Sequence, residues 1–160
     1  MSLETKGFQE LIDHLDGLAK VGETHGKQAL QEAGDIVKRI ETETAKSRHR
    51  KYSQNVGYNE LKKYPIRNGK LGGKYLSVGI KTTQTKSQRK KDEANVKAGK
   101  SRPTHWDKVK GLFFNNYGFY HNKTGAYIAG SNWIDEAFDK SRDEAYEKVR
   151  EVLEKGMDLK

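Results

Sequence analysis

Histidines are the first residues in this sequence that suggest chemistry, because imidazole binds metals and transfers protons near neutral pH. No two of them are three or four residues apart, and neither an HxH nor an HExxH spacing occurs. No Asp or Glu is placed to complete a known ligand set. We therefore expect surface histidines and no metal site. The residues are His14, His25, His49, His105 and His121.

A serine and a lysine three residues apart offer a second kind of chemistry. Ser87-x-x-Lys90, followed later by Lys123-Thr124-Gly125, imitates two of the three elements of the serine β-lactamase pattern. The third element is missing, and Ser87 lies in a polar stretch rather than at the start of an apolar helix where its reactivity is tuned. A small hydrolase is therefore only a residual hypothesis, and we expect no catalytic residue.

Cofactor and membrane chemistry find no support in the composition. The 160-residue chain has no cysteine, which excludes disulfides and thiolate sites. Gly69, Gly72 and Gly73 form neither a GxGxxG pattern nor a P-loop, so we expect no cofactor. The longest apolar runs have three or four residues, far below the ~20 of a membrane-spanning helix. We expect a single domain over residues 1–160.

Charge is distributed unevenly along the chain, whose net charge is +9. Residues 1–43 hold 5 basic and 9 acidic residues, residues 44–110 hold 19 and 4, and residues 111–160 hold 7 and 9. So many unbalanced positive charges repel one another unless they meet an anionic partner or water. A solvated basic surface, an acidic protein surface and a nucleic acid all remain open.

Hydrophobic periodicity predicts two helices before the basic region. Apolar residues at helical spacing predict helices over residues 7–20 and 24–47, with Gly22 ending the first and Thr24 capping the second. Turn-forming residues fill the next stretch, and alternation then predicts a strand over residues 75–80.

The second half of the sequence predicts a loop, a strand and a final helix. Residues 84–108 contain almost no apolar residue, which favours a long mobile loop that orders against a partner. The aromatic run at residues 109–120 predicts a strand, and Asn132 begins a helix over residues 132–155. These elements define an α+β fold: two N-terminal helices, a small mainly antiparallel sheet with a long basic loop, and a C-terminal helix packed on the sheet.

Aromatic residues next to the basic loop favour an interface. Trp and Tyr are enriched in protein interfaces, and aromatic rings beside Lys or Arg also stack on nucleic-acid bases. The strongest candidates for an interface are Arg89, Lys90, Lys91, Arg102 and Trp106.

The order of these features resembles the minor tail or tail-completion family of long-tailed phages and prophages. Gly7–Leu11 resembles the family's first-helix start, and residues 64–71 resemble its "A-P-V-x-T-G-x-L" turn before a strand. Residues 113–118 are similar to its "hydrophobic-hydrophobic-x-E-x-G-T" strand, and residues 133–138 to its last-helix start. The resemblance spans residues 7–155.

The resemblance implies a non-enzymatic structural protein that acts in tail completion or head–tail joining. It implies that identical subunits form a ring on assembly, and it leaves open whether the free chain is a monomer. It also implies contacts with connector, tail-terminator or tail-tube proteins. It also implies assembly in the host cytoplasm and a place in the virion at the tail or head–tail junction. The basic loop then faces either a neighbouring subunit or the DNA in the channel. The alternative is a nucleic-acid-binding module that uses the central basic loop.

Overall fold

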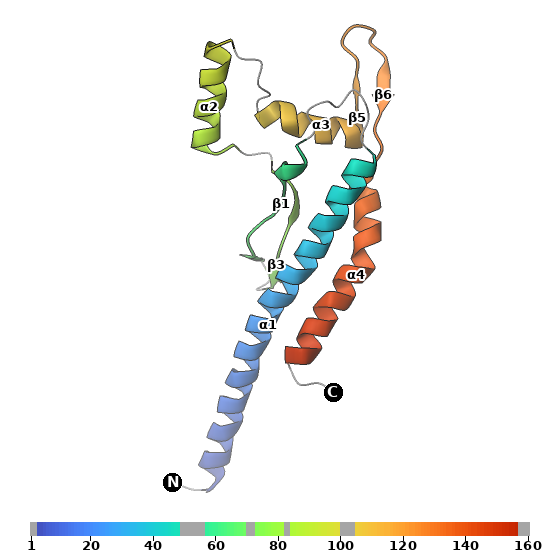
Figure 1. Ribbon diagram of the computed structural model, residues 1–160. Coiled ribbons are helices and arrows are strands. Elements are labelled where there is room, and N and C mark those ends of the chain that lie inside the picture. The colour runs from blue at the N-terminus through green and yellow to red at the C-terminus, as the bar shows by residue number, and fades with distance from the viewer. Residues whose placement is uncertain (1–2, 49–56, 70–72, 82–83, 100–104, 157–160) are drawn as a thin grey trace.

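The protein is α+β, as predicted, and its described residues form long helices and three separate two-stranded antiparallel ladders (Figure 1). The computed structural model describes residues 3–48, 57–69, 73–81, 84–99 and 105–156; for residues 3–19, 21, 106 and 107 it describes the backbone alone. Within these ranges, the C-terminal helix packs mainly along the N-terminal helix rather than on a ladder.

The N-terminal helix α1 (Leu3–Ser47) is continuous, so the prediction of two helices separated at Gly22 was wrong. A glycine costs only about 1 kcal/mol in a helix interior, which packing can offset. Thr24 does not cap a new helix; its hydroxyl donates to the carbonyl of Lys20 at 3.0 Å, one turn back. The far end of α4 also packs here, since a Cβ at Gly156 would lie 2.2 Å from the His25 ring.

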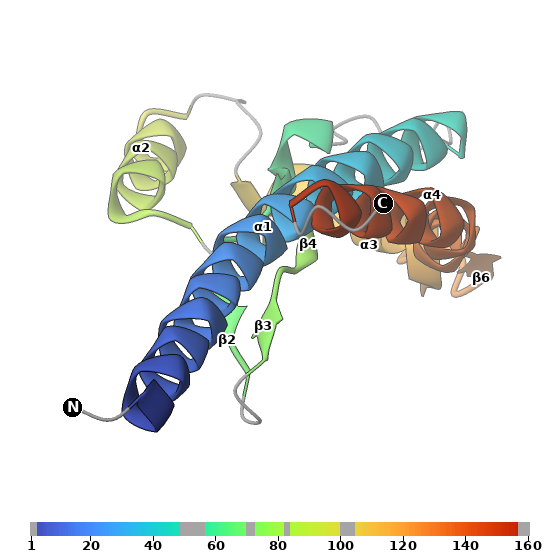
Figure 2. The ribbon, with the colours of Figure 1, turned by 90° about the horizontal axis from the view of Figure 1, so that it is seen from below.

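Helix α4 (Trp133–Gly156) runs antiparallel to α1, and the two form the main seam of the molecule (Figure 2). Ion pairs cross this seam at intervals: Arg48 with Glu136 at 2.7 Å, Arg39 with Glu144 at 2.7 Å, and Lys148 with Glu32 at 3.4 Å. Near the Lys148–Glu32 pair, α1 buries the small residues Ala29 and Ala33. Small side chains allow the two helix axes to approach closely.

The predicted strand over residues 75–80 is split in two by a bulge. β1 (Leu61–Lys63) pairs with β4 (Val78–Ile80), and β2 (Arg67–Asn68) pairs with β3 (Lys74–Tyr75). Three residues separate β1 from β2, but only two separate β3 from β4. The segment that joins β1 to β2 is therefore one residue longer than the segment opposite it. Pro65 falls in that longer segment and has no N–H to give to a ladder. A 3₁₀ turn, η1 (Tyr58–Glu60), precedes β1.

The region predicted as a mobile loop contains helix α2 (Lys86–Lys97). Its start is a capping box: the Thr85 hydroxyl accepts from the backbone N–H of Gln88, and the Gln88 side chain accepts from the backbone N–H of Thr85. Such a box satisfies two N–H groups that otherwise lack partners at a helix start. The apolar periodicity that identifies most helices is absent here, because no residue of α2 is buried.

The predicted strand over residues 109–120 is mostly helix α3 (His105–Tyr117). Val109, Leu112, Asn115 and Asn116 are buried, at the spacing of three or four residues that a helix requires. Only its last residues are extended, as β5 (Gly118–Tyr120), which pairs with β6 (Tyr127–Ala129) in a hairpin. A short apolar run cannot by itself distinguish a strand from a buried helix, and here the buried period decides.

The apolar core lies where these elements converge. Ala45 of α1, Leu61 of β1, Leu112 of α3 and Trp133 of α4 form one fully buried cluster. The Trp133 indole N–H donates to the carbonyl of Leu112 at 3.2 Å, which satisfies the polar atom of the largest buried side chain.

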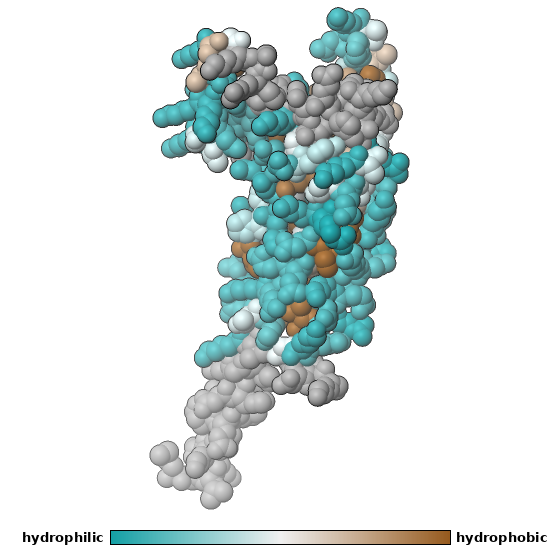
Figure 3. All heavy atoms as spheres, viewed as in Figure 1, coloured by the Kyte–Doolittle hydropathy of each residue, from teal (hydrophilic) through white to brown (hydrophobic). Residues whose placement is uncertain are grey.

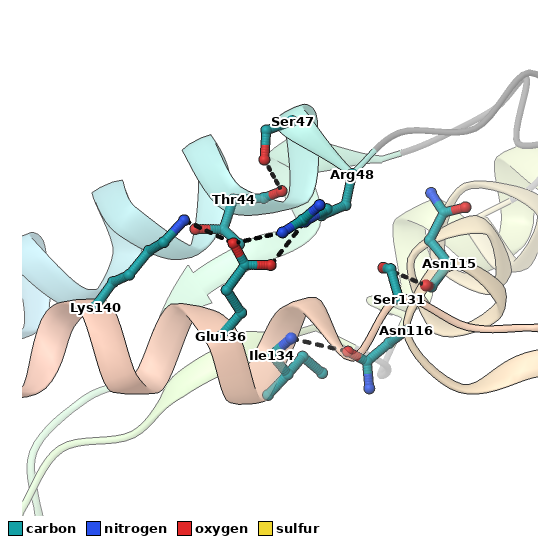
Figure 4. Close-up of polar contacts among 9 residues, drawn as sticks. All are labelled: Thr44, Ser47, Arg48, Asn115, Asn116, Ser131, Ile134, Glu136 and Lys140. Atoms are coloured by element: carbon teal, nitrogen blue, oxygen red, sulfur yellow. Dashed lines mark hydrogen bonds and ion pairs between the residues drawn. The ribbon is translucent and has the colours of Figure 1, made fainter.

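Polar contacts fasten the start of α4 to both α1 and α3 (Figure 4). Arg48 makes two hydrogen bonds to Glu136, at 2.7 and 3.0 Å, and Lys140 adds a third at 2.7 Å. Hydrogen bonds from these two cations lower the pKa of Glu136 to about 2. On the other side, Asn116 Oδ1 accepts from the backbone N–H of Ile134 at 2.8 Å and caps the helix.

Candidate interaction surfaces

Helix α2 carries three of the five predicted interface residues on successive positions. Arg89, Lys90 and Lys91 are all exposed, and the surface over α2 is mainly hydrophilic (Figure 3). The Arg89 guanidinium pairs with Glu93 one turn on, at 2.9 Å. The helix as a whole has five basic and two acidic residues. It presents a concentrated positive charge to whatever lies beside it.

The side chains of the other two predicted residues are not described. Arg102 lies outside the described residues. Trp106 is the second residue of α3, and only its backbone is described. The interface formed by these five residues therefore stays a prediction, and the structure shows only that Arg89, Lys90 and Lys91 share one exposed turn of α2.

A carboxylate of α2, that of Asp92, contacts the neighbouring helix α3. Asp92 Oδ2 accepts from the backbone N–H of His105, the first residue of α3, at 2.9 Å. It also accepts from the Gln84 side chain at 2.7 Å. A carboxylate at a helix N-terminus satisfies an N–H group without an intrahelical partner and faces the positive end of the helix dipole. Sequence reasoning missed Asp92, because its partner lies 13 residues away in a separate helix.

A polar cavity of about 280 Å³ lies between α2, α3 and η1. His105 is buried beside it, with Nε2 3.1 Å from the carbonyl of Lys81 and Nδ1 3.7 Å from Glu60 Oε2. The residues that line the cavity are Glu60, Gln88, Lys91, Asp92, Asn95, His105 and Lys108. Its two carboxylates and two ammonium groups balance, so it favours no single charge. Among the described residues, no three His, Asp or Glu side chains are grouped to hold a metal ion.

The partial β-lactamase pattern does not assemble into a site. Ser87 is exposed in the first turn of α2, and Lys123 is exposed in the β5–β6 turn. Figure 1 shows these two elements on opposite sides of α3. Ser87 and Lys123 therefore do not come together in the folded protein.

The β5–β6 hairpin has one face against the protein and one face outward. Phe119 and Ile128 are half-buried, and the Phe119 ring packs 5.0 Å from that of Phe114 on α3. Tyr120 and Tyr127 are paired across the strands on the opposite face, with ring centroids 5.2 Å apart. They are 71% and 55% exposed. The alternation of a strand places these tyrosines away from the core.

Tyr117, at the end of α3, is 61% exposed, and its ring stacks on that of Phe113 one turn back, with centroids 6.2 Å apart. Its carbonyl accepts from the Tyr127 hydroxyl at 2.8 Å, which fixes the Tyr127 ring over the base of the hairpin. We call Tyr117, Tyr120 and Tyr127 the tyrosine face. The aromatic run of the sequence indicated an interface or a core here, and only the strand register assigns each ring to one or the other.

The base of the hairpin is tightly fixed. Gly118 has φ +82°, and a Cβ at Gly130 would lie 1.9 Å from the carbonyl oxygen of Asn116, so neither position accepts a side chain. The Ser131 hydroxyl donates to the carbonyl of Asn115 at 2.7 Å (Figure 4). The tyrosine face is therefore held in a defined orientation relative to α3 and α4.

Glu41 is a buried carboxyl group in α1 that no sequence pattern indicates. It is 8% exposed, and its Oε2 has no hydrogen-bond partner among the described residues. Burial raises the pKa of Glu41 from 4.5 to about 7. An unpaired buried carboxyl group keeps its proton to a higher pH, because its charged form would lose its hydration.

Comparison with known proteins returns no match: no protein-family model, no curated protein and no solved structure is similar to this chain. In the described part of the chain, none of the helices combines the length and the apolar character needed to cross a membrane.

Proposed function

We propose that this protein is a structural subunit of a tailed phage or prophage virion. In this proposal it acts in tail completion or head–tail joining, within a ring of identical subunits at the tail or the head–tail junction. It is not an enzyme, uses no cofactor, and contacts connector, tail-terminator or tail-tube proteins. Assembly takes place in the cytoplasm of the bacterial host.

The observation that carries this proposal is that three elements project from one packed seam. The N-terminal part of α1 extends past the end of α4, while α2 and the β5–β6 hairpin extend from the opposite end (Figure 1). Helix α2 buries no residue, and the hairpin exposes two large tyrosines. Surfaces of this kind are costly for a free monomer and useful in a subunit whose neighbours cover them.

The arrangement of neighbouring genes tests the proposal most directly. Portal and capsid genes on one side and tail-tube genes on the other would support it. A position among regulators or nucleases would contradict it.

Virion assembly provides a functional test. We expect the double variant Arg89→Glu/Lys90→Glu to leave the fold intact by circular dichroism and to reduce joined particles at least tenfold by electron microscopy. The matched control is Arg142→Glu/Arg150→Glu, which changes two exposed arginines of α4. Normal assembly with both double variants would remove α2 from the proposed interface.

The exposed positive charge of α2 also favours the second candidate, a nucleic-acid-binding module. That function requires duplex binding near physiological salt with a log–log slope of about −0.9 per phosphate neutralised. The Arg89→Glu/Lys90→Glu variant would then lower affinity and reduce the slope. Binding that is weak or insensitive to salt would exclude this candidate.

A further inference from the structure

Two surfaces at opposite ends of the molecule are candidates for contacts between subunits. One is the tyrosine face on the β5–β6 hairpin. The other is the N-terminal extension, which we define as residues 3–20 of α1 and which runs beyond the last turn of α4 (Figures 1 and 2). Helix α4 ends at Gly156, which lies against His25 of α1, so the N-terminal extension lies beyond the end of α4.

The tyrosine face has the composition and rigidity of a protein interface. Its residues are more than half exposed, and the Tyr127 hydroxyl is already hydrogen-bonded to the Tyr117 carbonyl. Tyr offers a large contact area at a low entropy cost, since few of its torsions must be fixed. Within the described part of the chain, no third strand pairs with β5 or β6, and a lone two-stranded hairpin is marginal in water.

The N-terminal extension has the sequence pattern of a helix that packs on a partner. Steps of three or four residues lead from Leu11 through Leu15, Leu18, Gly22 and His25 to Ala29, which is buried, and α4 packs against α1 at His25. The apolar stripe of the seam therefore continues along the same side of the helix after α4 has ended. The apolar positions of the extension are Phe8, Leu11, Ile12, Leu15 and Leu18.

The charges of the two ends are opposite. The extension holds four acidic and two basic residues. The described residues of the other end, 84–99 and 105–131, hold eight basic and three acidic residues. Pairing of unlike ends brings opposite charges together, whereas pairing of like ends brings repulsion.

We propose that the N-terminal extension of one copy of this chain packs on the tyrosine face of the next copy, with its acidic residues towards the basic end that includes α2 and α3. This inference rests on the proposed assembly function and names the two surfaces that join neighbouring subunits. Because the two surfaces differ, the contact is heterologous and repeats from subunit to subunit. Such a contact closes into a ring when the rotation between subunits allows it.

Mixing two complementary variants of the full chain tests the pairing. The first, Tyr117→Asp/Tyr120→Asp, places negative charge on the tyrosine face and keeps the extension. The second, Leu11→Asp/Leu15→Asp, removes the apolar stripe and keeps the tyrosine face. Mass is measured by light scattering from micromolar to near-millimolar concentration at low salt.

We expect the wild-type chain to form oligomers that grow with concentration, and each variant alone to be monomeric. The mixture of the two variants should form a one-to-one dimer that grows no further, because each dimer has only defective surfaces left. The control Phe138→Asp/Tyr146→Asp, with two exposed aromatic residues of α4, should behave as wild type. A monomeric wild-type chain at every concentration, or a mixture that fails to associate, would overturn the pairing.

Cysteine cross-linking gives a second measurement that does not depend on disruptive variants. The natural chain has no cysteine, so single-cysteine chains report only on the introduced positions. Oxidation of a mixture of Tyr120→Cys and Leu15→Cys chains should give a mixed disulfide dimer, at least tenfold more than a mixture of Tyr146→Cys and Leu15→Cys. Equal yields would overturn the pairing. Portal and tail genes beside this gene would still support the proposed function in that case, so the two failures are distinguishable.

Discussion

The α1–α4 seam and helix α2 are both helical, but different forces hold them. The seam buries Ala29, Ala33 and Trp133 and adds ion pairs along its length. Helix α2 buries nothing and depends on its own capping box and on Asp92. The seam therefore contributes most of the stability of the fold, whereas we expect α2 to separate from it at little cost in free energy. Regions with few buried contacts are the ones that open and rearrange on binding.

The largest expected effect is at Trp133, where four elements meet. Trp133→Ala removes the largest fully buried side chain and should lower the free energy of unfolding by about 3–5 kcal/mol, measured by urea denaturation. The corresponding change in α2 is Val96→Ala, at a residue 66% exposed, which should cost less than about 0.5 kcal/mol. Similar losses of stability in both variants would show that α2 contributes as much to the fold as the seam does.

Glu41 destabilises α1 at neutral pH, although the α1–α4 seam is the most extensively packed part of the molecule. Its pKa of about 7 in the folded state exceeds 4.5, so between these values the unfolded chain releases a proton that the folded chain retains. The contribution of Glu41 to the free energy of unfolding is therefore fully present below pH 4.5 and is lost as the pH rises to 7. The loss is about 3 kcal/mol, at 1.36 kcal/mol per pKa unit.

The variant Glu41→Gln should remove this loss, so its stability at pH 8 should exceed that of the wild type. Urea denaturation at pH 4.5 and pH 8 measures both. Glu43→Gln, at an exposed neighbour on the same helix, provides the control and should show no such gain. A wild-type chain equally stable at both pH values would contradict the account of Glu41.

The smallest expected effect is at Asp92 and concerns α2 alone. Asp92→Ala removes the cap of α3 and the link to Gln84, at a local cost of about 1 kcal/mol. Amide hydrogen exchange should become faster over residues 84–99 and remain unchanged in α4. Glu93→Ala, which removes only the exposed pair with Arg89, should have a smaller effect. Faster exchange in α4 as well would show that α2 is part of the cooperative core.

The sequence alone determined the α+β class, the C-terminal helix and the concentration of positive charge near α2. Each of these depends on a local or compositional signal: the period of apolar residues in 133–153, or a count of lysines and arginines. The capping box at Thr85 and Gln88 was equally local and marked the start of α2, although the polar composition suggested a loop.

Only the tertiary structure decided the continuity of α1, the helical state of residues 109–117 and the outward direction of Tyr120 and Tyr127. Gly22 costs about 1 kcal/mol in a helix interior, and α4 packs on α1 three residues further on, at His25. An apolar run becomes a helix or a strand according to which of its residues meet the core. These outcomes depend on contacts between residues that are distant in sequence, whose energies no local pattern contains.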